Sequence, residues 1–212
     1  MIENTFKTFG IMIDFPGLVI CDPFVYDSFI KNHVPESDMV GVNLLQYISE
    51  NSELWKKMLD DGVMIPIPIK NHRDSIVKIG LDINEEEKSK GRLFTAPVYP
   101  LRIESGLVAI ADILYVMNWP KQRLSESGLK VSPDFEVSPG CITDFEAGIY
   151  SVEITGFSSK DCIIDFPSKH HHITRSMTAG HFMNFHKESK LPVFPHHLID
   201  ESTLFDFSVY RD

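Results

Sequence analysis

The chain has 212 residues, 43% of them hydrophobic and 24% charged, which are the proportions of a folded globular protein and argue against a disordered chain. The formal net charge of -10 repels phosphate backbones and no cluster of Lys and Arg offsets it, so direct nucleic-acid binding is disfavoured. The N-terminal sequence lacks the pattern of a signal peptide, and the longest apolar runs are too short to span a bilayer, so a cytoplasmic protein without membrane contact is expected.

Two stretches, one in each half of the chain, resemble one another at an offset of about 90 residues. IMIDFPGLVICDPFVY at residues 11–26 aligns with LRIESGLVAIADILYV at residues 101–116, and both predict a strand, a turn and a strand. The matched positions include Ile13 with Ile103, Ile20 with Ile110, and Asp22 with Asp112. This similarity indicates a duplicated β-rich module.

A single amphipathic helix is predicted over residues 43–60, because the apolar residues recur at helical spacing and leave the polar residues on the other face. Asn43 can cap the start of this helix, and Gly62 follows its end. Asp22-Pro23 also has the form of a turn or of a helix start, with the aspartate as the cap and the proline at the first helical position. By contrast, residues 121–140 are interrupted by prolines and glycines and predict a long loop.

A second internal match joins residues 62–79 to residues 148–166. The apolar residues of the first segment alternate with a period of two, which is typical of a half-buried strand. Pro66 and Pro68 can donate no ladder hydrogen bond, so this strand is expected at a sheet edge. The matched pairs include Ile67 with Ile154.

The charged run from Asn84 to Arg92 is the expected boundary between two modules, residues 1–91 and residues 92–212. The second module contains a His-rich segment, and the alternation in residues 203–212 predicts a closing strand. The predicted fold class is therefore α+β and β-rich, with two related antiparallel β-modules and one amphipathic helix.

Seven of the nine histidines lie between Lys169 and His197. His170 and His172 would share one face of a strand, as two ligands of zinc or another transition metal can. His181 and His186 are five residues apart, which puts them on opposite faces of a strand. A solvated polar segment is the favoured interpretation, and a response to pH is another, since imidazole titrates near ~6.5. The metal-site interpretation takes its ligands from His170, His172, His181 and His186.

The matched aspartates, Asp22 and Asp112, could do acid and base chemistry or bind a cation, but capping of the following backbone is the favoured interpretation. The sequence contains no GxSxG, P-loop or GxGxxG motif. Cys21, Cys141 and Cys162 lie in apolar, strand-like settings and predict buried, reduced thiols. An enzyme is therefore the less favoured class.

The pattern SGLVAIAD at residues 105–112, followed by GIYSVEI at residues 148–154, resembles uncharacterised bacterial β-rich families. Some small acidic bacterial proteins of this kind act as immunity proteins beside toxins. The resemblance implies a protein-binding role of that type, and it transfers no catalytic residue to this chain.

The favoured function is non-enzymatic binding of a protein, as an immunity-type or antitoxin-type inhibitor of a basic partner, because a negative field speeds encounter with basic proteins. The alternative is a metal-dependent enzyme that uses the C-terminal histidines, assisted by Asp112 or Asp165. A further alternative is a structural or assembly subunit, a homo-oligomer in which the strand near Ile65 pairs with another chain.

Overall fold

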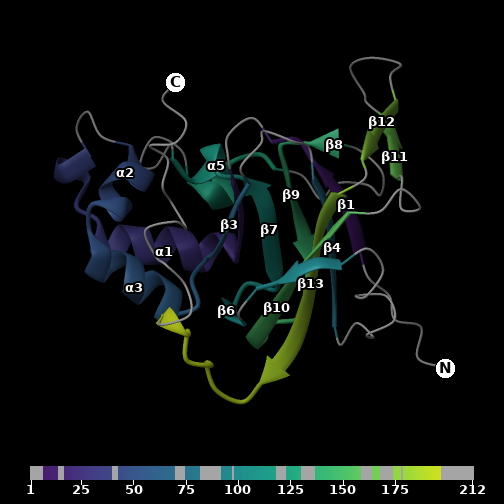
Figure 1. Ribbon diagram of the computed structural model, residues 1–212. Helices are drawn as coiled ribbons and strands as arrows, with labels where there is room; N and C mark the ends of the chain where they lie inside the picture. Colours follow the sequence, from purple (N-terminus) through teal and green to yellow (C-terminus); the bar gives the residue numbers. More distant parts are fainter. Residues whose placement is uncertain are drawn as a thin grey trace.

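The computed structural model describes most of the chain in eleven ranges, and its strands form two main sheets (Figure 1). The predicted class, α+β and rich in strands, is confirmed. The described ranges are residues 7–13, 17–39, 43–69, 75–81, 92–96, 98–117, 123–129, 137–158, 164–167, 174–177 and 179–196.

The large sheet has the strand order β5-β10-β13-β4-β1-β8, and β6 also pairs with β10. The small sheet has the order β3-β2-β7-β9, and β11 and β12 form a separate hairpin. The strands of the large sheet are β1 (Lys7–Ile11), β4 (Ser75–Leu81), β5 (Arg92–Thr95), β6 (Tyr99–Ile103), β8 (Val137–Ser138), β10 (Gly148–Ser158) and β13 (Ala179–Glu188). The other strands are β2 (Gly17–Cys21), β3 (Ile65–Pro68), β7 (Leu107–Asp112), β9 (Gly140–Asp144), β11 (Ile164–Pro167) and β12 (Thr174–Met177).

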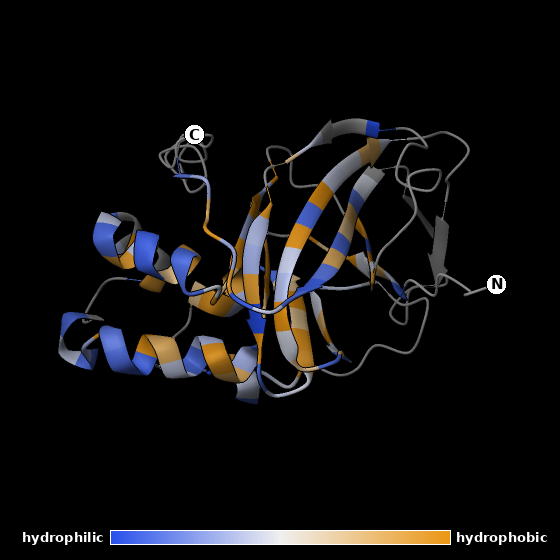
Figure 2. Cartoon of the chain, turned by 90° about the horizontal axis from the view of Figure 1, so that it is seen from below, coloured by the Kyte–Doolittle hydropathy of each residue, from blue (hydrophilic) through white to orange (hydrophobic). Residues whose placement is uncertain are grey.

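The small sheet is covered on both faces, because every residue of β2 is buried although its side chains alternate between the two faces. The large sheet packs against one face of the small sheet, and the helices lie on the other face of the small sheet (Figures 1 and 2). Apolar stretches recur along the strands, and hydrophilic stretches recur along the helices (Figure 2). The helical elements are α1 (Pro23–His33), α2 (Leu44–Ser49), α3 (Ser52–Asp60), α5 (Leu114–Met117) and the 3-10 turns η1 (Glu36–Met39) and η2 (Leu124–Glu126).

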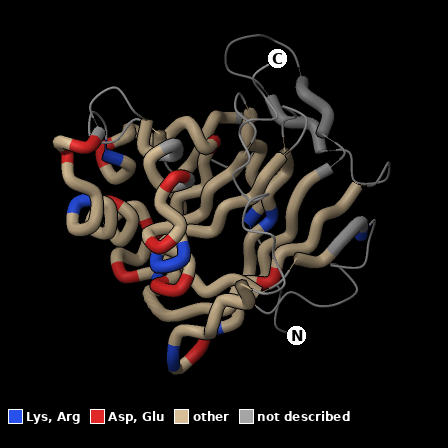
Figure 3. Tube along the Cα trace, turned by 60° about the vertical axis from the view of Figure 1, so that its left-hand side comes forward, with Lys and Arg blue, Asp and Glu red and all other residues tan. Residues whose placement is uncertain are grey.

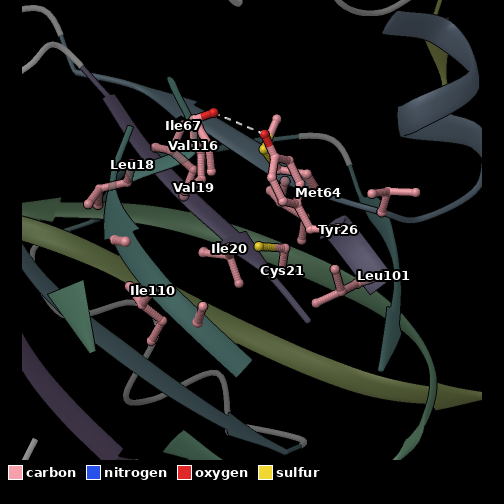
Figure 4. Packing of buried hydrophobic residues seen from close by; sticks show 14 of the residues in the cluster. Leu18, Val19, Ile20, Cys21, Tyr26, Met64, Ile67, Leu101, Ile110 and Val116 are labelled. Carbon is pink, nitrogen blue, oxygen red and sulfur yellow. Dashed lines mark hydrogen bonds between the residues drawn. The ribbon is translucent and has the colours of Figure 1, made fainter. Parts of the chain in front are cut away.

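The pairing of β2 with β7 confirms the first internal match. These antiparallel strands place Ile20 opposite Ile110, the two residues that the sequence comparison aligns. In the sequence alignment Val19 corresponds to Ala109, and Cys21 to Ala111. In the sheet Val19 lies opposite Ala111 and Cys21 lies opposite Ala109, which is the exchange expected for a two-fold axis between the two isoleucines. Near the same axis the Tyr26 hydroxyl donates a hydrogen bond of 3.2 Å to the carbonyl of Val116, its aligned position (Figure 4).

The second internal match is displaced by one strand. β3 pairs with β2 as β9 pairs with β7, so Ile67 opposite Leu18 corresponds to Thr143 opposite Val108. In the same way β4 corresponds to β10, with Val77 opposite Phe9 and Val152 opposite Tyr99. The alignment of Ile67 with Ile154 is therefore wrong, because apolar alternation is shared by neighbouring strands and does not fix which strand is which.

Strand β13 lies at the centre of the large sheet, between β10 and β4. It is antiparallel to β10 and parallel to β4, so it has no counterpart within the repeated unit. Both halves of the chain contribute strands to both sheets.

The predicted helix over residues 43–60 is present as two helices, α2 and α3, with a break at Glu50 and Asn51. The break lets the apolar residues of both helices face the core, including Leu44, Ile48 and Met58. The predicted helix start at Asp22-Pro23 is confirmed as the beginning of α1.

The edge position of β3 is confirmed by its place in the small sheet. Residues 203–212, for which a closing strand is predicted, and residues 84–91 lie outside the described part of the chain. Within the described ranges, no helix combines the length and the apolar character needed to cross a bilayer.

Candidate functional site

The histidines predicted as metal ligands are only partly placed by the structure. His170 and His172 lie outside the described residues, and Asp165 lies in β11. His181 and His186 both lie in β13, where their spacing puts them on opposite faces of the large sheet. His181 lies 3.2 Å from the Ser75 hydroxyl through Nδ1, and His186 lies 3.0 Å from Asn184 Nδ2 through Nε2.

Across the described ranges, no three His, Cys, Asp or Glu side chains are placed to hold one metal ion. The two histidines of β13 cannot share a centre, because the sheet separates them. A zinc or other transition-metal site with His170 and His172 stays a prediction.

Asp22 is a structural residue at the junction of two segments. Its side chain is fully buried, and Oδ1 accepts the N–H groups of Phe24 at 2.8 Å and Val25 at 3.3 Å, which caps α1. Oδ2 accepts the N–H groups of Glu104 at 2.8 Å and Ser105 at 2.7 Å. The carboxylate therefore fastens the start of α1 to the turn between β6 and β7.

Asp112 and Asp27 make similar contacts with backbone amides. Asp112 Oδ1 accepts the N–H of Leu114 at 2.8 Å, at the start of α5. Asp27 accepts the N–H groups of Leu124 at 2.9 Å and Ser125 at 2.8 Å. The capping interpretation of the matched aspartates is confirmed.

Cys21 and Cys141 are fully buried and free, as the sequence predicts for both. Burial raises the pKa of Cys141 to about 12. Burial, together with the nearby charges of Asp22 and Asp27, raises the pKa of Cys21 well above its ordinary value. Neither thiol therefore supplies a nucleophilic thiolate near neutral pH. Cys162 lies outside the described residues.

Stability should fall in mild acid because of His181. Burial lowers the pKa of this imidazole to about 4, from 6.5. The unfolded chain therefore binds a proton that the folded protein excludes, so the contribution of His181 to stability is constant above pH 7 and falls as the pH drops from 6.5 towards 4. The two pKa values correspond to a loss of about 2 kcal/mol from this group at pH 5, and this is an upper limit because the residue as a whole is only half-buried.

The measurement is urea unfolding of the wild type and of His181→Asn at pH 7.5 and pH 5. The first pH lies about 1 unit above the ordinary imidazole pKa, and the second lies about 1.5 units below it. The difference in free energy between the two pH values should be smaller in the variant. An equal difference in both proteins would remove His181 as the cause.

The helical side of the molecule carries much of the negative charge. Residues 23–61 contain seven acidic and three basic residues, a net charge of -4. Asp27 is the buried member of this set. Acidic segments recur among the helices in Figure 3. The remaining acidic residues are exposed or half-buried and are Glu36, Asp38, Glu50, Glu53, Asp60 and Asp61.

Several of these carboxylates have close partners. Asp61 pairs with Lys57 at 2.8 Å, Glu53 with Lys56 at 3.9 Å, and Asp60 with His196 at 2.8 Å. The pairs leave an excess of negative charge, because there are fewer cations than carboxylates in this layer. Exposed pairs of this kind contribute little to stability, and the excess of carboxylates gives this layer a negative field.

The outer edge of β3, where Pro66 is buried and Pro68 is exposed, offers no donor for strand addition. Pro66 and Pro68 lack an N–H, so the ladder bonds to β2 must use Ile65 and Ile67, and the prolines face the outer edge. At the opposite edge of the small sheet, the Asp144 carbonyl accepts the Lys7 ammonium at 2.7 Å. Assembly through the strand near Ile65 is therefore disfavoured.

Opening this edge should cause self-association. Pro66→Ala/Pro68→Ala restores two outward N–H groups without changing charge, so we expect concentration-dependent oligomers in sedimentation velocity. Pro35→Ala, in an exposed loop, is the control and should stay like the wild type. A double variant that sediments like the wild type at every concentration would show that the prolines do not protect this edge.

The segment after β13 crosses from the large sheet to α3. Leu191 packs against Gly62, where an added Cβ would meet Leu191 Cδ1 at 2.9 Å. Phe194 is buried against Tyr99, with ring centroids 5.2 Å apart, and the His196 imidazole reaches Asp60. Residues 190–196 are named the strap below. Their sequence, KLPVFPH, has no helical or strand period, so only its two prolines signal an extended segment.

No family model matches the chain, and no curated protein matches it. Two solved structures align over most of it. ComJ from Bacillus subtilis, described as the inhibitor of the DNA degrading activity of NucA, has 8% sequence identity and a TM-score of 0.43, over 86% of this chain and 96% of that chain. A protein described as crocagin biosynthetic gene J has 6% identity and a TM-score of 0.44, over 87% of this chain and 99% of that chain. One of these two structural neighbours is thus described as an inhibitor, in line with the weak resemblance to uncharacterised and immunity-like families. Both similarities are too low to carry an argument about function.

Proposed function

We propose that this chain is a non-enzymatic protein-binding protein whose helical layer, residues 23–61, contacts a basic partner and inhibits it as an antitoxin or immunity protein does. The observation that carries the proposal is the excess of exposed carboxylates on this layer, which holds a net charge of -4 out of the total of -10.

The proposal rests on electrostatic steering. Carboxylates at the rim of an interface attract a basic protein over about 8 Å at physiological salt, and they act mainly on the association rate. Glu50 and Glu53 lie at the junction of α2 and α3 and are both exposed, so they are well placed for this effect.

The buried acidic residues support the same reading. Asp22, Asp27 and Asp112 each accept backbone N–H groups, so their carboxylates hold turns and helix starts together. These contacts give the buried aspartates a structural role. Only the carboxylates at the surface are therefore placed to contact another protein.

The test begins with capture of a basic protein from the source organism by immobilised wild-type chain, followed by purification of that protein and measurement of association rates. Glu50→Gln/Glu53→Gln should slow association roughly tenfold at low salt and less at high salt. The matched control is Asp144→Asn/Glu146→Gln, which removes the same charge from two exposed positions, the end of β9 and the turn that follows it. Equal rates for both double variants, or no basic protein that binds after purification, would contradict the proposal.

A further inference from the structure

The strap displays one apolar side chain to solvent while its neighbours fix it in place. Val193 is 88% exposed, whereas Phe194, the next residue, is 1% exposed. Of the large apolar residues identified as exposed in the described ranges, Val193 has the greatest exposure, and Phe24 follows at 53%. The exposed valine and the buried phenylalanine therefore point to opposite sides of the segment, as successive side chains of an extended chain do.

Three contacts anchor the strap. Leu191 lies against Gly62, Phe194 lies against Tyr99, and the His196 imidazole is hydrogen-bonded to Asp60 at the end of α3. The His196 ring also packs edge-on against the Phe194 ring, with the ring centroids 4.9 Å apart. The backbone N–H of His196 donates a hydrogen bond of 3.0 Å to the Phe194 carbonyl. The strap is thus fastened on both sides of Val193.

Two prolines restrict the backbone around the exposed residue. Pro192 precedes Val193 directly, and Pro195 follows it by two positions. Proline fixes φ near −65° and favours an extended conformation in the residue before it. A segment restricted in this way loses little conformational entropy when a partner binds it.

The strap adjoins the acidic layer. His196 contacts Asp60, the last residue of α3. The next residue, Asp61, accepts a hydrogen bond from Lys57. An apolar anchor beside a charged rim is the usual arrangement of a protein interface, in which a few buried side chains supply most of the affinity.

We infer that the strap is a recognition loop whose Val193 side chain enters an apolar groove of the protein partner. The groove would be one that accepts an extended, proline-flanked segment, and the acidic residues of α3 would meet basic residues at its margin. This inference rests on the proposed function, because it assigns the anchor within the same interface.

The test uses the purified basic protein retained in the capture experiment. Val193→Asp should weaken its equilibrium binding at least tenfold, mainly through faster dissociation, because a carboxylate cannot enter an apolar groove without losing its hydration. Val98→Asp is the matched control, since Val98 is also an exposed valine, at 40%, outside the strap. Both variants should melt like the wild type, because neither side chain is buried.

A photo-reactive p-benzoylphenylalanine at position 193 gives a second measurement. It should cross-link to the purified partner, and the same group at Val98 should not. The inference is overturned if Val193→Asp binds like the wild type while Glu50→Gln/Glu53→Gln still slows association, a result that leaves the proposed function standing. It is also overturned if position 193 cross-links to a second copy of this chain, or if no purified protein binds the chain, in which case the proposed function falls as well.

Discussion

Replacing Asp22 with alanine should destabilise the protein by about 4 kcal/mol, because a buried carboxylate that accepts four backbone N–H groups is removed at once. Two of these donors belong to the first turn of α1 and two to the turn after β6. The substitution deprives all four of their acceptor at a position where the Asp22 side chain is fully buried. Urea unfolding followed by far-ultraviolet circular dichroism measures the loss.

Two variants control the Asp22 experiment. Asp27→Ala removes a carboxylate that accepts only the N–H groups of Leu124 and Ser125, so we expect about 2 kcal/mol. Asp144→Ala changes an exposed aspartate and should cost less than about 0.5 kcal/mol. A loss for Asp22→Ala no larger than that for Asp27→Ala would show that the bonds to Glu104 and Ser105 contribute little.

Asp22 also shows how far the sequence predicts structure. The pair Asp22-Pro23 predicts a helix start because capping depends on residues within three positions. The bonds to Glu104 and Ser105 depend on a contact between segments about 80 residues apart, which no local pattern encodes.

The strands illustrate the same division. The paired prolines correctly predict that β3 lies at an edge, because a missing N–H is a local property. The first internal match aligns Ile20 with Ile110, but that alignment alone predicts no pairing, and it is the structure that places the two isoleucines opposite one another. The second match failed because Ile67 and Ile154 share only apolar alternation, a pattern common to most strands of a sandwich.

For the candidate surface, the net charge favours a basic partner and the sequence contains the acidic excess of residues 23–61, but it does not predict that these residues form one helical layer. The strap gave even less signal. Val193 and Phe194 are adjacent apolar residues, and only their tertiary contacts decide that one is exposed and the other buried. Functional residues on a loop are therefore harder to predict than core residues, whose period repeats along an element.

Gly180 occupies a close approach between two strands of the large sheet. It lies in β13 opposite Ile76 of β4, and a Cβ built there would come within 2.0 Å of the Ile76 carbonyl oxygen and 2.7 Å of its carbonyl carbon. Both atoms belong to the backbone, so no rotation of a side chain relieves the overlap. β13 joins the two halves of the large sheet, so its separation from β4 would affect the whole sandwich.

Gly180→Ala should therefore destabilise the protein by about 3 kcal/mol, because β4 and β13 must move apart and lose ladder hydrogen bonds and apolar contact. Gly148→Ala is the matched control in β10. Its added Cβ would meet only side-chain atoms, Lys187 Cε at 3.2 Å and Tyr150 Cε2 at 3.3 Å, and the lysine can move, so we expect less than about 1 kcal/mol. Urea unfolding of both variants distinguishes the two sites. Equal losses would mean that the sheet widens at Gly180 without strain, and β13 would then be a loosely held strand rather than the central connection between the repeated halves.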